Sequence, residues 1–186
     1  MDNERTPLLI LGLGNLICAD DGLGVIVAHR LLERYEAPDG VRILDGGTQG
    51  LALLPYIEDA ERVILVDAIR DDAPPGSFVR LDGDEVAPAV AARLSVHQIG
   101  VADLLDGAHW RERFPSTLVL LGLVPTSVEL CFGLSAAVER RLPELVDQVV
   151  AEARRLGFDL RPRVQNEANP DFSVGGARAL GLSGGS

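Results

Sequence analysis

Short apolar runs alternate with amphipathic segments over the first third of the chain. Residues 8–12 form a continuous apolar run that ends in glycine, which is typical of a strand buried on both faces of a sheet. Residues 41–45 and 62–68 predict two further strands. Because helical segments separate these strands, the pattern predicts an α/β fold with a mostly parallel sheet and right-handed crossovers.

Two helices are expected between the three strands. Residues 23–35 place apolar side chains at helical spacing, and Pro38 then stops the helix. The second helix is expected to begin at a Thr48 cap and to run to about Ile57. Each helix would return the chain to the start of the next parallel strand.

The second half of the chain departs from this alternation. Residues 71–76 (DDAPPG) predict a turn, and residues 77–81 predict a strand. No long helix fits between this strand and the third one, so it is expected to run antiparallel at an edge of the sheet. Residues 117–124 predict the last strong strand.

Two further helices are expected in this half. Residues 97–107 predict a short helix. Residues 135–157 predict a long amphipathic helix that Ser135 caps, Pro143 bends and Gly157 ends.

Length and bulk composition narrow the class of protein. The 186 residues suggest one α/β domain over residues 1–160, followed by a flexible tail over residues 161–186 that is rich in Pro, Asn, Gly and Ser. The net charge of −11 argues against nucleic acid and anionic membranes as partners. No apolar run reaches about 18 residues, the N-terminus does not resemble a secretory signal, and Cys18 and Cys131 form no CxxC pair. We therefore expect a cytoplasmic protein with two free thiols.

Carboxylates follow the first three predicted strands. Asp20 and Asp21 lie in the loop after the first strand, Asp45 ends the second and Asp67 ends the third. Ligands of open α/β sheets collect outside the carboxyl ends of the strands, so these acids are expected at one edge if strands two and three flank strand one. The alternative for each acid is a cap of a helix or turn, because carboxylates suit the positive end of a helix.

His97 stands out among the three histidines because it opens a predicted helix. A helix N-terminus favours the neutral imidazole, which is the form that binds metals. Two aspartates and this histidine would suit nickel, zinc or manganese. A structural histidine is the alternative.

The GLGN segment at residues 12–15 raises the possibility of a nucleotide site. A dinucleotide site needs a third glycine where Ile17 stands, and the helix begins too late to face a pyrophosphate. We favour a tight turn whose glycines let the loop approach neighbouring strands and which Asn15 braces. Gly22 and Gly24 are expected to leave the acids room to project towards a ligand. Cys18 has no evident base partner and is expected to be a small apolar filler.

Four motifs in order carry a family resemblance: GLGN followed by DDGLG (residues 12–24), DGGT (45–48), DA (67–68) and HQIG (97–100). Together they resemble the maturation endopeptidases of nickel–iron hydrogenases, over about residues 8–157. The resemblance implies a three-layer α/β/α sandwich around a twisted, five-stranded, mostly parallel sheet.

The resemblance also implies a site and an activity. Asp21, Asp67 and His97 would contact metal, and with Asp45 they would form the catalytic site. The enzyme would be an aspartyl-type endopeptidase that trims the C-terminal extension from a hydrogenase large-subunit precursor after nickel insertion. The nickel would be carried by the precursor, although other divalent ions can occupy such a site. Attack by a metal-activated water and attack through a carboxylate base both stay open.

Three alternatives differ in function. A non-catalytic nickel-sensing module would bind the precursor through the same acids, and a permanently bound metal would make a metalloprotease of small peptides. Peptidyl-tRNA hydrolases also open with a strand and GLGN, but they need a His–Asn pair in a region that reads ICADDGLG here. The acidity of the chain also opposes a tRNA partner.

Overall fold

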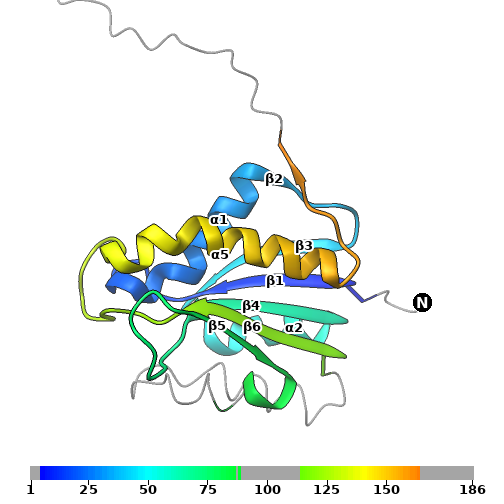
Figure 1. Ribbon diagram of the computed structural model, residues 1–186. Coiled ribbons are helices and arrows are strands. Elements are labelled where there is room, and N and C mark those ends of the chain that lie inside the picture. Colours follow the sequence, from blue (N-terminus) through cyan, green and yellow to red (C-terminus); the bar gives the residue numbers. More distant parts are fainter. Residues whose placement is uncertain (1–4, 87, 89–113, 164–186) are drawn as a thin grey trace, which may run out of the picture.

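A five-stranded sheet forms the centre of the computed structural model, which describes residues 5–86, 88 and 114–163 (Figure 1). Its order is β3-β1-β4-β6-β5, and its strands are β3 (Val41–Gly47), β1 (Leu8–Leu13), β4 (Arg62–Ala68), β6 (Thr117–Leu123) and β5 (Phe78–Asp82). The first four strands in this order run parallel, and β5 runs antiparallel to β6 at the edge. The predicted α/β fold and its antiparallel edge strand are confirmed.

Helices cover both faces of this sheet (Figure 1). Helices α1 (Leu23–Arg34) and α5 (Ala136–Arg155) pack on one face. The other face is covered by the 3₁₀ turn η2 (Gly50–Leu53) and the short helix α2 (Leu54–Glu58). The 3₁₀ turn η3 (Gly83–Glu85) leads into Val86, which packs on the same face. The result is the expected three-layer sandwich.

Successive residues of β1 belong to opposite cores. Leu8 and Ile10 pack in the cluster with α1 and α5, whereas Leu9 and Leu11 pack in the cluster with η2 and α2. Side chains alternate between the two faces of a strand. Both faces of β1 are covered, so its sequence reads as an unbroken apolar run rather than an alternating one.

The helix expected from Thr48 to Ile57 differs in the structure. It divides into η2 and α2, and the residue that precedes η2 is Gln49, which makes no side-chain capping bond. Pro55 lies in the first turn of α2, where a missing N–H costs nothing. The predicted Thr48 cap is therefore wrong.

The long final helix agrees with the prediction at both ends. The hydroxyl of Ser135 accepts a hydrogen bond from the Val138 N–H at 3.5 Å. Gly157 follows the helix with a φ of 97°, a conformation that favours glycine. Pro143 lies inside α5. None of the described helices is long and apolar enough to cross a membrane.

A small antiparallel ribbon joins the ends of α1 and α5. Strand β2 (Tyr35–Glu36) pairs with β7 (Arg161–Pro162), and the Arg163 N–H donates to the Arg34 carbonyl at 2.7 Å. The first residues of the predicted tail thus pair with the domain. Residues 164–186 and the predicted helix 97–107 lie outside the described residues.

Candidate active site

The strand order brings three of the sequence-predicted acids to one edge of the sheet. Central strand β1 lies between β3 and β4, with Gly12 opposite Asp45 on one side and Val66 on the other. Asp67 lies one residue beyond Val66, at the carboxyl end of β4. We call this end of the sheet, with the loop that follows β1, the acid edge.

The loop after β1 folds back onto the acid edge. The Gly14 N–H donates to the Gly47 carbonyl at 3.0 Å, which ties the loop to the end of β3. Asp21 lies in the 3₁₀ turn η1 (Ala19–Gly22) and is 5% exposed. Its Oδ2 accepts a hydrogen bond from the Asn15 N–H at 2.9 Å, so the backbone of Asn15 braces the loop.

Glycines make this close approach possible. A Cβ at Gly24 would lie 2.0 Å from the Val66 carbonyl oxygen, and a Cβ at Gly14 would lie 1.7 Å from the Asp21 carbonyl oxygen. Both distances exclude a larger side chain. Gly24 therefore lets α1 begin directly against β4, beside Val66, which is the residue before Asp67.

Asp67 is a carboxylate buried at the end of an apolar strand. It is 1% exposed, and its Oδ1 accepts the Ala68 N–H at 2.8 Å. Burying an ionised carboxylate is costly unless the protein provides partners or the group serves a ligand. Asp21 and Asp67 are thus two buried acids at the same end of the sheet, contributed by two separate segments of the chain.

Asp20 has a structural role that the sequence did not reveal. It is completely buried, and its Oδ2 accepts the N–H groups of Thr126 at 2.7 Å and Ser127 at 3.3 Å. Its Oδ1 accepts the Ser135 N–H at 2.6 Å. This carboxylate therefore holds both ends of the loop between β6 and α5. Nothing in the pair DD separates its role from that of Asp21, because its partners lie more than a hundred residues away.

Asp45 is more exposed than the other acids. Its Oδ2 lies 2.8 Å from Nε2 of His29 on α1, and its Oδ1 accepts the Gly47 N–H at 3.0 Å. The two side chains are 47% exposed for His29 and 38% for Asp45. Asp45 therefore stands at the solvent side of the acid edge, with the imidazole of His29 beside it.

The fourth predicted site residue, His97, lies outside the described residues. Within the part of the chain that the structure describes, no three His, Cys, Asp or Glu side chains gather as a metal site. Asp21 and Asp67 supply oxygen donors that suit a divalent ion, and a third protein donor would have to come from elsewhere.

The two cysteines meet beside the acid edge. Cys18 and Cys131 form an isolated parallel β-bridge, and both are free thiols. Cys18 is half-buried and Cys131 is exposed. The predicted filler therefore lies at a junction between two loops rather than inside the core.

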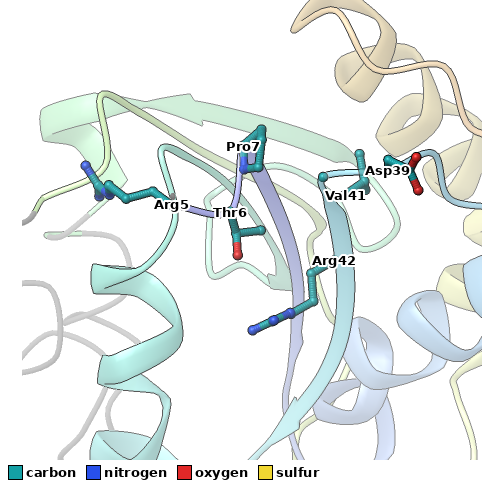
Figure 2. A pocket seen from close by; sticks show the side chains of 7 residues that line it. Arg5, Thr6, Pro7, Asp39, Val41 and Arg42 are labelled. Atoms are coloured by element: carbon teal, nitrogen blue, oxygen red, sulfur yellow. The ribbon is translucent and has the colours of Figure 1, made fainter. Parts of the chain in front are cut away.

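An opening of about 530 Å³ lies at the opposite end of the sheet from the acid edge (Figure 2). It is lined by residues at the amino ends of β1 and β3, among them Arg5, Asp39 and Arg42. None of the acids of the acid edge lines it. This opening is therefore separate from the candidate active site.

Comparison with known proteins identifies the class. The family model described as hydrogenase maturation protease (HycI) matches residues 25–152. The Hydrogenase 2 maturation protease of Escherichia coli K12 is 37% identical over 158 residues, which cover 84% of this chain and 96% of that protein. The hydrogenase expression/formation protein HupD of Rhodobacter capsulatus is 37% identical over 155 residues, which cover 82% of this chain and 74% of that protein.

The fold comparison agrees. The solved structure of the hydrogenase maturating endopeptidase HybD from E. coli superposes with a TM-score of 0.80 at 37% identity, covering 84% of this chain and 98% of that one. The chain therefore belongs to the hydrogenase maturation protease family, and it is a hydrolase of the peptidase class.

Proposed function

We propose that this endopeptidase removes the C-terminal extension from a nickel–iron hydrogenase large-subunit precursor after nickel insertion. The observation that carries the proposal is that two acids, Asp21 and Asp67, are buried at the same end of the sheet in a chain of this family. The nickel belongs to the precursor, which is the substrate. We infer that the reaction takes place in the cytoplasm, where the free thiols Cys18 and Cys131 persist.

The proposed roles follow from the chemistry of the donors. Asp21, Asp67 and His97 would contact the nickel of the precursor, since carboxylate oxygens and an imidazole nitrogen suit this ion. Binding a cation between the two buried aspartates would also relieve the cost of holding their charges out of water. The precursor's metal would thereby fix the scissile bond at the acid edge.

Hydrolysis needs a base that takes a proton from the attacking water and an acid that gives a proton to the leaving amine. The carboxylates of the acid edge can supply both, which makes the reaction of the aspartyl type. Asp45 has the solvent access that a proton-transferring group needs, and His29 is positioned to orient it.

The test is the intact mass of the precursor after incubation with the protein, with and without nickel loaded. Nickel-dependent loss of one C-terminal peptide is expected. Asp21→Asn and Asp67→Asn should each lower kcat/KM by roughly 100-fold or more, the usual worth of a proton-transferring or charge-stabilising group.

Glu152→Gln is the matched control, because Glu152 is a buried acid of α5 that faces β5 and not the acid edge. It should cleave at nearly the normal rate under conditions in which it is folded. Binding of the precursor without any cleavage would contradict the proposal and favour a nickel-sensing module.

A further inference from the structure

Four large apolar side chains project into solvent next to the acid edge. Leu130 is 79% exposed and Phe132 is 84% exposed, while Leu16 and Ile17 are each 44% exposed. We call these four residues the rim patch. Single exposed apolar residues are ordinary, but several together on one surface mark a binding site.

The two halves of the rim patch lie side by side although they are more than a hundred positions apart in the chain. The Cys131 N–H donates to the Ile17 carbonyl at 3.0 Å, and the Ala19 N–H donates back to the Cys131 carbonyl at 2.6 Å. These bonds place Ile17 beside the segment that carries Leu130 and Phe132. Figure 1 shows this loop, between β6 and α5, next to the start of α1.

The loop between β6 and α5, which carries Leu130 and Phe132, is held in place by hydrogen bonds. Asp20 binds both of its ends through backbone N–H groups, and the Ser135 hydroxyl donates to the Thr126 hydroxyl at 3.0 Å. Ala19 adopts a φ of 46°, a left-handed conformation that costs energy for a residue with a Cβ. The protein thus maintains a strained turn and a buried carboxylate to present an apolar surface.

We propose that the rim patch is the docking surface for the folded body of the hydrogenase precursor, through an apolar area of that protein next to its C-terminal extension. The proposal rests on the proposed function. The rim patch is continuous with the acid edge, because Asp21 follows Ile17 by four residues in the same loop. A precursor that brings its scissile bond to Asp21 must contact the surface around that loop.

A preorganised apolar surface suits this task. A substrate protein that binds a rigid surface loses less conformational entropy than one that must order a loop, so more of the contact energy appears as affinity. Anchoring the precursor through the rim patch also leaves the carboxylates free for the metal and the peptide bond.

The test compares Leu130→Ser/Phe132→Ser with the control Leu32→Ser. Leu32 is 45% exposed near the C-terminal end of α1, away from the acid edge. With nickel-loaded precursor as the probe, the double variant should raise KM roughly tenfold or more, as the loss of central apolar contacts does. The loss should fall on KM rather than on kcat, and the control should match the unmodified protein.

Each result has a defined meaning. A KM of the double variant within twofold of the unmodified protein, at normal cleavage, would overturn the docking proposal and leave the proposed function intact. A concentration-dependent dimer of the unmodified protein that the double variant abolishes, with KM unchanged, would overturn it in favour of self-association. Failure of the unmodified protein to cleave the precursor would count against the proposed function. If the unmodified protein then still binds the precursor and the double variant does not, the docking surface would be upheld by itself.

Discussion

Asp20 and Glu152 are both buried carboxylates, but the protein satisfies them in opposite ways. Asp20 receives three backbone N–H groups from the loop between β6 and α5. Glu152, which is 7% exposed, receives the guanidinium groups of Arg80 at 3.1 and 3.3 Å and of Arg155 at 3.1 Å. One acid is held by dipoles and the other by full positive charges.

The difference matters for the electrostatics of each region. Two arginines offset the charge of Glu152, so this region fastens α5 to β5 without adding to the local negative field. Backbone amides stabilise the charge of Asp20 but leave it uncompensated. The two regions therefore differ in the partners of their buried acid, since Glu152 is bound by two cations and Asp20 by neutral backbone groups.

The strongest test of this contrast is Asp20→Ala. It would leave three loop N–H groups without their acceptor, at about 1–3 kcal/mol for each group that stays buried. We expect the free energy of unfolding to fall by about 3 kcal/mol or more in urea titrations. Asp20→Asn keeps one acceptor oxygen and should lose less. A loss below about 1 kcal/mol for the alanine variant would mean that the loop does not depend on this carboxylate.

Glu152→Gln should have a smaller effect on stability, about 1–3 kcal/mol, because hydrogen bonds to charged partners are weakened but not removed. Burial raises the pKa of Glu152, yet the hydrogen bonds from Arg155 and Arg80 outweigh it and hold the pKa below the ordinary value of 4.5. Because the pKa of Glu152 is lower in the folded state than in the unfolded state, its ionised form stabilises the fold above pH 4.5. This contribution is lost as the pH falls through the folded-state pKa, where Glu152 takes up a proton. Urea unfolding from pH 7 to pH 3 should show the difference between the two proteins shrinking at the acid end. A constant difference would contradict this account.

The smallest effect on stability is expected at the His29–Asp45 pair. Both side chains are more than a third exposed, and such pairs contribute less than about 1 kcal/mol. His29→Ala and Asp45→Asn should therefore unfold almost as the unmodified protein does. Asp45→Asn should nevertheless lower kcat/KM roughly 100-fold, because the amide cannot transfer the proton that we assign to this carboxylate. Normal cleavage by Asp45→Asn would remove Asp45 from the catalytic site.

Much of the fold was accessible from the sequence because its signals are local. Apolar runs such as residues 62–68 report burial on both faces of a sheet, and β4 occupies those residues. The antiparallel edge strand followed from the lack of room for a crossover helix. The Thr48 cap failed because capping preference is weak beside the geometry that Pro55 and the glycines impose.

The gathering of the acids at one end of the sheet could also be predicted from the sequence, because the carboxyl ends of parallel strands lie together. Only the tertiary structure separated Asp20 from Asp21, because adjacent residues of a 3₁₀ turn point in different directions and the partners of Asp20 lie beyond residue 125. It alone brought His29 to Asp45, joined the loop of Ile17 to that of Phe132, and set Glu152 between two arginines. Local periodicity reports which side chains are buried, whereas the partner of a buried polar group depends on which distant segments the closed chain brings into contact.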